Sequence, residues 1–374
     1  MFIDSPTKKQ LNTIYAAFAS RAKECGDPAC VKYLQLGTQI VRVISYAADF
    51  IPHMEAQWTY ILRDDAPHYD ATIIVWRENE LAKMAHYAAT CDKESPVYRQ
   101  WRLDKIRGTA APINEVGIVD PEFHYRQPVV EIYPNINSLM AWDPANRVFF
   151  YAVTDFSPEE FIKRGHLCVY GLARILKGPT RNLGHGAVIG LDGHGALVCG
   201  MGYRGKSTLS ITAMLEGFDY VTDDYILLDK SDGILRAWPI YSIITLGPAV
   251  YQKLSPRLDA KFVSNNGRKD KYVFNIANYH ERFASAYPIK CCLFPRFVNA
   301  AEPSIEVGDR AIATDEFAYS TVMQTSEVQD MRLIAKLCSF VDDLPCFRFN
   351  LTTDFFKNIR CLRTFFESNI VAKH

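Results

Sequence analysis

The segment HGAVIGLDGHGALVCGMGYRGKSTLSITAMLEGFDYVTDDYILLD, residues 185–229, decides the fold of this chain. It begins with two short apolar runs, 187–191 and 196–199, which flank the dipeptide Asp192-Gly193. An Asp-Gly pair between apolar runs favours a tight hairpin turn, so we expect a β-hairpin here. The second run leads directly into a glycine-rich loop.

The loop GMGYRGKS at 200–207 matches the pattern G-x-x-x-x-G-K-S, and it is followed by a helical run, 208–216, that ends at Gly217. Backbone N–H groups of such loops turn inward around a polyphosphate, and the helix N-terminus adds a favourable dipole. We therefore predict that Lys206 bridges phosphate oxygens and that the Ser207 hydroxyl binds Mg²⁺. A glycine-rich turn with an incidental lysine is the alternative. The predicted nucleotide-binding residues are Gly200, Met201, Gly202, Tyr203, Arg204, Gly205, Lys206, Ser207 and Thr208.

Two adjacent carboxylates follow the helix. FDYVTDDYILL at 218–228 reads as a third strand interrupted by Asp223 and Asp224. Adjacent strand residues face opposite sides, so only one carboxylate can face the phosphates, and we expect the other to be tied to the backbone or to metal-bound water. Because an unpartnered buried carboxylate is costly, a functional pair is favoured over a purely structural one. A carboxylate that faces a γ-phosphate can orient the attacking hydroxyl and accept its proton.

Together these residues resemble the C-terminal catalytic domain of the bacterial HPr kinase/phosphorylase and its related kinases, which share a nucleotide core with phosphoenolpyruvate carboxykinase. The spacing is also similar, since His185 precedes Lys206 by 21 residues and Asp224 follows Lys206 by 18. The resemblance implies that Asp224 accepts the proton of the substrate hydroxyl and that His185 lies beside the γ-phosphate. It also implies that Lys206 and Ser207 bind phosphate and magnesium, with Asp223 as a further metal ligand. Taken alone, His185 would be read as a structural histidine.

The resemblance is strong over 184–228 and weaker from there to about residue 350. DKYVF at 270–274 looks like a lysine-aromatic strand of the related kinases, and CLFPRF at 292–297 looks like a later core strand that carries an arginine. Lys271 and Arg296 are therefore candidate phosphate or acceptor ligands. Ordinary surface charges are the alternative for both.

The chain departs from the family pattern in two places. The family loop has a small residue and then glycine at its third and fourth positions, where this chain has Gly202 and Tyr203. We expect Gly202 to take the left-handed backbone position, so that Tyr203 and Arg204 project towards the acceptor or the base. WPIYSIITLGPAV at 238–250 offers no acidic residue in place of the glutamate that gives HPr kinases a second metal contact. Phosphorylase activity and HPr as the substrate are therefore in doubt.

The whole chain predicts an α/β (α+β) protein in two parts. Residues 1–150 are expected to form a mixed α/β accessory or substrate-recognition domain, and residues 151–374 the HPr kinase-like P-loop catalytic domain. A capping-box helix from Ser157 to Lys177 is predicted to join them. In the first part, helices are expected at 7–24 and 49–62, and strands at 39–46, 71–78, 129–135 and 147–153.

Composition restricts the partners. The 374 residues include 42 basic and 42 acidic ones, so no basic excess favours general nucleic-acid binding. No stretch approaches the roughly 18 apolar residues of a membrane span, and the charged N-terminus disfavours export. The ten cysteines lie between Cys25 and Cys361 without zinc-site spacing, which indicates reduced thiols in a cytoplasmic protein.

These observations predict an ATP- and Mg²⁺-dependent kinase that transfers the γ-phosphoryl group to a hydroxyl, either on a serine of a peptide or protein or on a small-molecule alcohol. A nucleotide-binding regulator is one alternative, although binding alone needs no base at position 224. A degenerate scaffold without phosphotransfer is the other, and the tyrosine at position 203 favours it. The sequence leaves open the acceptor, the choice among ATP, GTP and pyrophosphate, and homo-oligomer formation.

Overall fold

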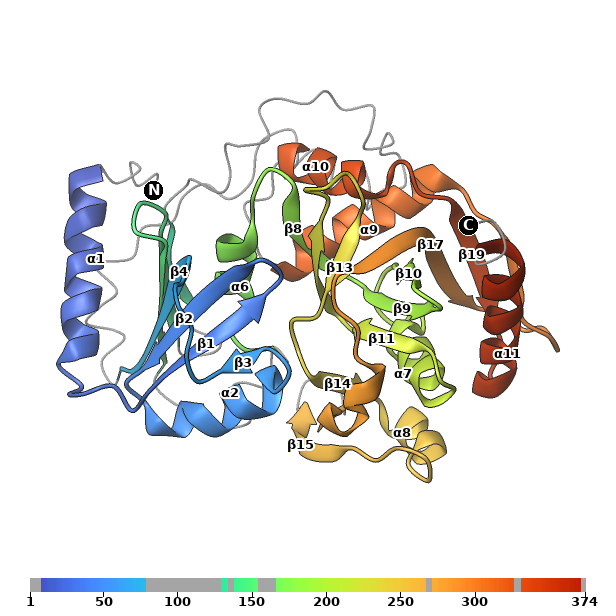
Figure 1. The fold of residues 1–374 in the computed structure, drawn as a ribbon, viewed down its shortest axis with the longest axis horizontal. Coiled ribbons are helices and arrows are strands. Elements are labelled where there is room, and N and C mark those ends of the chain that lie inside the picture. The colour runs from blue at the N-terminus through green and yellow to red at the C-terminus, as the bar shows by residue number, and fades with distance from the viewer. Residues whose placement is uncertain are drawn as a thin grey trace.

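The chain folds as a mixed α/β protein, and the α/β class predicted from the sequence is confirmed. The computed structural model describes residues 8–78, 129–133, 138–153, 166–266, 271–325 and 331–370. Over these ranges the strands form a seven-stranded, a nine-stranded and a three-stranded sheet. The seven-stranded sheet occupies one side of the molecule and the nine-stranded sheet the other (Figure 1).

The N-terminal sheet has the strand order β3-β1-β2-β4-β7-β6-β5. Strands β2, β4 and β7 run parallel to one another, and the other neighbours pair antiparallel. The elements are α1 (Lys8–Lys23), β1 (Cys30–Leu36), β2 (Gln39–Ser45), α2 (Ile51–Trp58), β3 (Leu62–Arg63), β4 (Ala71–Arg77), β5 (Val129–Tyr133), β6 (Ser138–Asp143) and β7 (Val148–Val153). The predicted helices and strands of this half are found, although the helix expected to extend to Leu62 ends at Trp58. Strands β1, β3 and β6 were missed.

Helices cover both faces of this sheet because its central strands are apolar on both sides. In β7, Phe149 and Tyr151 join the core beneath α2, while Phe150 and Ala152 join the core beneath α1. The same alternation holds in β4, whose unbroken apolar run predicted a buried strand.

The C-terminal sheet has the order β11-β9-β10-β17-β13-β12-β8, with β19 paired to β17 and β18 paired to β19. Strands β10, β17 and β19 are parallel neighbours, so their carboxyl ends lie along one edge. The strands are β8 (Arg181–His185), β9 (Ala187–Leu191), β10 (His194–Val198), β11 (Asp219–Thr222), β12 (Tyr225–Asp229), β13 (Arg236–Trp238), β17 (Tyr287–Phe297), β18 (Ser304–Val307) and β19 (Cys346–Leu351).

The predicted hairpin between β9 and β10 is confirmed. Its two turn residues, Asp192 and Gly193, have φ angles of 50° and 79°. Two successive left-handed residues are what a two-residue turn of type I′ requires, and Asp-Gly adopts them readily. The hairpin pairs Val198 with Ala187, which brings the entry of the glycine loop next to the start of β9.

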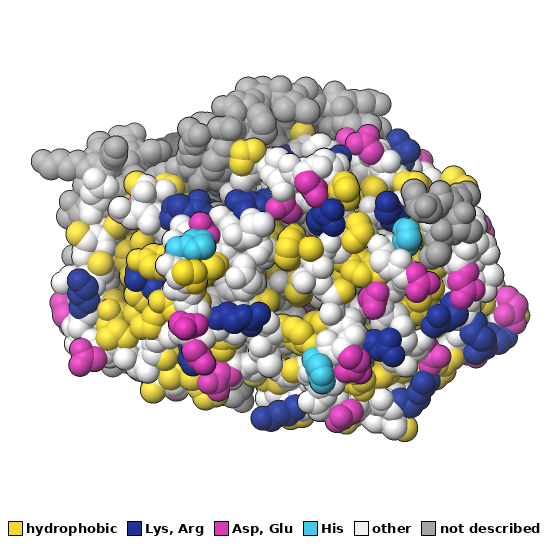
Figure 2. Space-filling model, viewed as in Figure 1, with side chains coloured by type: hydrophobic (Ala, Val, Ile, Leu, Met, Phe, Trp, Pro, Cys, Tyr) yellow, Lys and Arg dark blue, Asp and Glu magenta, His cyan; other side chains and the backbone are white. Residues whose placement is uncertain are grey.

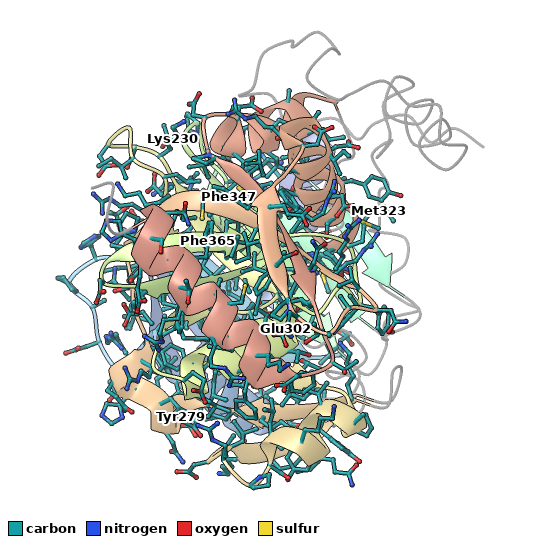
Figure 3. All side chains as sticks on the ribbon, turned by 90° about the vertical axis from the view of Figure 1, so that its right-hand side faces the viewer. Lys230, Tyr279, Glu302, Met323, Phe347 and Phe365 are labelled. Carbon is teal, nitrogen blue, oxygen red and sulfur yellow. The ribbon has the colours of Figure 1, made fainter. Side chains whose placement is uncertain are left out.

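Helices pack on the outside of this sheet, and a small sheet flanks it. Phe365 on α11 lies against Phe347 on β19, with ring centroids 4.8 Å apart (Figure 3). The remaining elements are α6 (Val169–Leu176), α7 (Lys206–Leu215), β14 (Ile243–Leu246), α8 (Pro248–Leu254), β15 (Lys261–Asn266), β16 (Lys271–Asn275), α9 (Arg310–Thr325), α10 (Met331–Val341) and α11 (Phe355–Phe365).

The helix predicted from Ser157 to Lys177 is wrong at residues 166–168. Among the described residues it begins only at Val169, because Cys168 has a left-handed backbone with φ of 51°. Residues 157–165 of the prediction lie outside the described residues. The predicted end before Gly178 is correct.

Described residues of the two halves share one hydrophobic core. Met54 and Trp58 of α2 belong to the same buried cluster as Tyr225 and Tyr241. Hydrogen bonds cross at the same place, where the Gln57 carbonyl accepts from the Ser242 amide at 2.7 Å and the Gln57 side-chain oxygen accepts from the Leu167 amide at 2.9 Å. The N-terminal half therefore supports residues that lie behind the carboxylate pair described below.

The surface carries both signs of charge. Figure 2 shows basic and acidic side chains interspersed over one face, as expected from 42 residues of each kind. The nine cysteines of the described residues are free of disulfide bonds. No helix within the described ranges is long and apolar enough to cross a membrane.

Helix α6 packs closely on β7 at Gly171, and a substitution at this position tests that packing. A Cβ at this position would lie 2.4 Å from Cδ1 of the buried Phe149 ring. We expect Gly171→Ala to lower the free energy of unfolding by on the order of 1–2 kcal/mol, because overpacking costs about 1–3 kcal/mol and outweighs the roughly 1 kcal/mol gain in helix propensity. Urea denaturation measures the change.

Gly178→Ala is the matched control, since its Cβ would meet nothing closer than an Arg181 nitrogen at 3.6 Å. Equal or greater stability of Gly171→Ala relative to that control would contradict the close packing of α6 on β7.

Candidate functional site

The glycine loop joins β10 to α7, in the strand, loop and helix order expected from the sequence. The Cys199 amide donates to the Leu293 carbonyl at 3.0 Å, which keeps β10 paired with β17 up to the loop. The loop closes at Gly205, whose φ of 93° starts the helix. A Cβ on Gly205 would lie 2.9 Å from Leu351 Cδ1, so both the backbone angle and the close packing require glycine.

Tyr203, rather than Gly202, takes the left-handed position in the loop. Its φ is 65°, and its side chain is 76% exposed. The expectation that Gly202 would adopt this conformation is therefore wrong. The Lys271 ammonium lies 5.7 Å from the centre of the Tyr203 ring, within range of a cation–π contact. A positive φ angle strains the backbone of a tyrosine, and strained residues of this kind are frequent at functional sites.

Lys206 is the first residue of α7, and it is buried. Its Nζ donates hydrogen bonds to the carbonyl oxygens of Gly200 at 2.8 Å and Met201 at 3.2 Å. Burial lowers the pKa of Lys206, and the nearby charges of Asp224 and Asp223 oppose that shift. The ammonium is therefore hydrogen-bonded to the loop backbone and stabilised by the charges of two carboxylates.

The carboxylate pair lies at a break between two strands, not within one. The interruption expected at Asp223 and Asp224 is confirmed, but the segments on either side of it are two separate strands, because β11 pairs with β9 whereas β12 pairs with β8. At the break, Asp224 has a φ of 66°, and the Tyr225 amide donates to the Asp223 carbonyl at 2.9 Å. This three-residue turn resembles a γ-turn, a strained conformation.

Asp223 is a buried carboxylate that makes no hydrogen bond of normal geometry, although the Ser207 hydroxyl is near enough to act on it. Its exposed fraction is 1%, and neither side-chain oxygen has a partner of normal geometry among the described residues. Burial, and then the charge of Asp224, raises the pKa of Asp223 to about 7, although the Ser207 hydroxyl and the Lys206 and Lys271 charges counteract the rise. Of the two partners expected for the second carboxylate, the backbone does not bond to this side chain, and metal-bound water stays a prediction.

Asp224 lies beside His185. Its Oδ1 is 3.8 Å from His185 Nε2, and its side chain is 27% exposed. Burial by itself would raise the pKa of Asp224, but His166, His185, Lys271 and Lys206 together hold it below its ordinary value. The two neighbouring carboxyl groups thus differ, with Asp224 stabilised in the ionised form and Asp223 in the protonated form. Such a division is characteristic of acid and base sites.

Helix α9 positions His185. The Ser320 hydroxyl pairs with His185 Nδ1, and the Thr321 hydroxyl accepts from the His185 backbone amide at 2.9 Å. Strand β8 places His185 directly opposite Tyr225, the residue after Asp224. The pairing of β8 with β12 and the contacts from α9 therefore set the distance between His185 and Asp224.

Three residues near the site were not predicted from the sequence. His166 packs edge-on against Tyr225 and Tyr241, with ring centroids 4.7 Å and 4.5 Å away, and its charge acts on Asp224. Ser320 holds His185, and Glu316 Oε2 lies 3.3 Å from where a Gly200 Cβ would be. None of them belongs to a local motif, so no sequence signal singled them out.

Lys271 and Arg296, the two candidate phosphate or acceptor ligands outside the glycine-loop segment, have different surroundings. Lys271, at the start of β16, is close enough to act electrostatically on both carboxylates and on Lys206. Arg296 lies at the far end of β17, is exposed, and donates from Nε to Asn350 Oδ1 at 2.8 Å. The structure therefore brings together Lys271, Lys206, His185 and the aspartates, whereas Arg296 is paired with Asn350 of β19.

The remaining loop residues line the entry to α7. Met201 is 37% exposed, and Arg204 is exposed with its Cβ and Cγ beside Gly200. A Cβ at Gly202 would meet no atom within 4 Å, so the loop is open there. Thr208 accepts a hydrogen bond from the Thr212 hydroxyl through its carbonyl oxygen.

The donor set fits a divalent cation held jointly with phosphate. Among the described residues, no group of three or more His, Cys, Asp and Glu side chains could hold a metal ion. Mg²⁺ is usually bound through one or two carboxylates together with substrate phosphates and water, so such a cluster is not required. The two unpartnered oxygens of Asp223 and the nearby Ser207 hydroxyl are suitable ligands.

Comparison with known proteins gives little beyond this geometry. No family model matches the chain, and no curated protein matches it. Among solved structures, the Hpr(Ser) kinase/phosphatase from Coxiella burnetii is similar over 49% of this chain and 95% of that chain, with 11% sequence identity and a TM-score of 0.26. A likeness this loose assigns no role to any residue.

The raised pKa of Asp223 predicts a pH-dependent stability. Its pKa rises from 3.8 to about 7 on folding, so the stability contributed by the protonated carboxyl is present below pH 4 and is lost as the pH rises to about 7. Relative to wild type, Asp223→Asn should therefore gain stability across this window, by on the order of 2–4 kcal/mol. Urea denaturation at several pH values, without nucleotide or divalent cation, measures the difference.

The exposed Asp65 provides the control for this experiment. Asp65→Asn, the same substitution at the surface, is measured at the same pH values as the reference. A difference between Asp223→Asn and wild type that stays constant between pH 4 and pH 7 would mean that the buried carboxylate does not titrate as described.

Proposed function

We propose that this protein is an ATP- and Mg²⁺-dependent kinase that transfers the γ-phosphoryl group to a hydroxyl, on a serine of a peptide or protein or on a small-molecule alcohol. We also propose that residues 151–374 act as an HPr kinase-like P-loop domain. Both proposals rest on the motif spacing in the sequence and on the geometry around Asp224.

One observation carries the proposal. The glycine-loop lysine, Lys206, shares its surroundings with an ionised carboxylate, Asp224, that is also 3.8 Å from His185. A site for phosphate binding alone does not require an acidic group, because a carboxylate repels phosphate. Its presence beside the loop is explained if it acts on a neutral hydroxyl instead.

The residues of this chain would divide the work. The loop backbone and Lys206 would hold the phosphates, and Lys206 would exchange its present bonds to the Gly200 and Met201 carbonyls for phosphate oxygens. Asp224 would orient the acceptor hydroxyl and take its proton, and the lowered pKa of Asp224 keeps it ionised and ready to accept. His185 and Lys271 would stabilise the negative charge that gathers there.

Mg²⁺ would be held by Asp223 and Ser207 together with phosphate oxygens, and it would supply neutralisation of phosphate charge. Binding of the cation would also remove the cost of an ionised, unpartnered Asp223. The protonated state of Asp223 in the absence of ligands is consistent with this role, since its proton would leave as the cation binds.

A nucleotide-binding regulator is the second candidate. It is favoured by the self-contained loop, in which Lys206 already bonds to two carbonyl oxygens, and by Tyr203 in a strained position. The same arrangement fits a scaffold that has lost phosphotransfer. Separate measurements of ATP turnover and ATP binding distinguish these two candidates from the kinase.

Two substitutions test the proposal. With ATP, Mg²⁺ and a panel of serine peptides and small alcohols, we expect acceptor-dependent ADP formation by the wild type. Asp224→Asn should lower it by about 100- to 10,000-fold, the usual worth of a general base, while leaving ATP affinity within a few-fold. Lys206→Ala should lose both turnover and affinity. Coupled-assay rates and calorimetric titration give the two quantities.

Lys230→Ala and Asp65→Asn are surface controls of the same residue types and should keep wild-type rates. If ATP binds but no acceptor raises turnover above that of Asp224→Asn, the protein is a nucleotide-binding regulator and not a kinase. If ATP does not bind at millimolar concentration, the protein is a scaffold that has lost both functions.

A further inference from the structure

Tyr203 and Lys271 are in contact at the glycine loop, although they belong to different parts of the fold. Tyr203 lies in the loop between β10 and α7, whereas Lys271 is the first residue of β16 in the three-stranded sheet. The Lys271 Nζ atom is 5.7 Å from the centre of the Tyr203 ring. Within the described ranges, no hydrogen bond or ion pair holds this ammonium, so the ring is the group that can fix its position.

Tyr203 is an unusual residue for its place in the loop. Its backbone is left-handed, with a φ of 65°, an angle that glycine adopts without strain. Its side chain is 76% exposed, so burial of the ring contributes little to the stability of the core. The contact with Lys271 is an interaction that glycine could not provide.

Strand β16 directs Lys271 towards the carboxylate pair. Side chains two residues apart on a strand share a face, so Lys271 starts from the same face as Val273. Val273 is buried in the core that also contains Tyr225, the residue after Asp224. In agreement with this direction, the charge of Lys271 acts on both aspartates and on Lys206.

The backbone of β16 keeps a fixed place relative to the loop. Ile211 and Met214 of α7, the helix into which the loop leads, share a buried cluster with Ile244 of β14 and Phe274 of β16. Figure 1 shows β14 beside α7. The flexible part is therefore the lysine side chain, and a ring that holds its ammonium removes much of that freedom.

We propose that Tyr203 is a positioning residue, whose ring holds the Lys271 ammonium beside the glycine loop so that Lys271 acts together with Lys206 on bound phosphates. The inference rests on the proposed function, since it assumes that the loop binds phosphates. It adds a role for the tyrosine that stands where the related kinases have glycine.

Affinities for inorganic tripolyphosphate and for β,γ-imido ATP, each titrated calorimetrically with Mg²⁺, test the proposal. Lys271→Met removes the charge and should weaken both ligands by about tenfold. Tyr203→Ala should weaken both by about two- to fivefold, the usual worth of an exposed cation–π contact. Tyr203→Phe keeps the ring face and should bind both ligands within about twofold of the wild type.

A double-mutant cycle separates positioning from a change in the loop itself. If Tyr203 acts through Lys271, adding Tyr203→Ala to Lys271→Met should cause no further loss of affinity. Tyr203→Gly removes the backbone strain and should be at least as resistant to urea as the wild type. It should nevertheless bind both ligands as weakly as Tyr203→Ala, because the ring is absent.

The N-terminal half provides a matched control. The Tyr69 ring is 45% exposed and also contacts a cation, since the Arg42 guanidinium carbon lies 3.9 Å from the ring centre. Tyr69→Ala should leave both affinities unchanged. Lys230→Met, which removes a lysine paired with Asp343, should also leave them unchanged.

The outcomes distinguish this inference from the proposed function. Unchanged affinity of Tyr203→Ala or Lys271→Met, additive losses in the double variant, or an equal loss in Tyr203→Phe and Tyr203→Ala would overturn the positioning role while the phosphate site stands. If neither ligand binds the wild type at millimolar concentration, the proposed function and this inference both fail.

Discussion

Two carboxyl groups that are neighbours in the chain and buried together cannot both be ionised at low cost, and the arrangement around Asp223 and Asp224 follows from this constraint. The groups that act on the pair come from separate elements. Lys206 lies on α7 and Lys271 on β16, whereas His185 lies on β8 and His166 in the segment before α6. They act unequally on the pair. Asp224 is stabilised as an anion, whereas Asp223, more deeply buried and without hydrogen bonds, is stabilised in its protonated form.

The backbone near the carboxylate pair is strained, and the surrounding strands keep it in this conformation. Asp224 and Tyr203 both have positive φ angles, which cost on the order of 1–3 kcal/mol each for residues other than glycine. At Asp224 the backbone is fixed on both sides, because its carbonyl accepts from the Gly186 amide at 3.0 Å and Tyr225 is paired with His185. The chain can adopt this turn because β11 and β12 belong to different strand pairs, and the break between them leaves the two carboxylates beside the loop.

The N-terminal half contributes to the site without supplying a described side chain to it. Gln57, at the end of α2, fixes Leu167 and Ser242 through its side-chain oxygen and its carbonyl. Leu167 follows His166, and Tyr241, which precedes Ser242, packs against the His166 ring and donates its hydroxyl to the Leu167 carbonyl at 2.7 Å. The position of His166 behind Asp224 thus depends on α2, which makes the shared core a physical connection between the two halves.

The sequence by itself determined the features that short-range chemistry dictates. Asp192 and Gly193 specify the hairpin turn, Gly205 and Lys206 specify the loop and the start of its helix, and the apolar run of β4 specifies a buried strand. Only the tertiary structure decided that the segments before and after Asp223 and Asp224 pair with different strands and that Tyr203, not Gly202, is left-handed. It alone also placed His166 and Ser320 near Asp224 and His185. The physical reason is that turns and helix starts depend on adjacent residues, whereas strand partners and the charges around a buried carboxylate come from segments far apart in the chain, whose meeting no local pattern encodes.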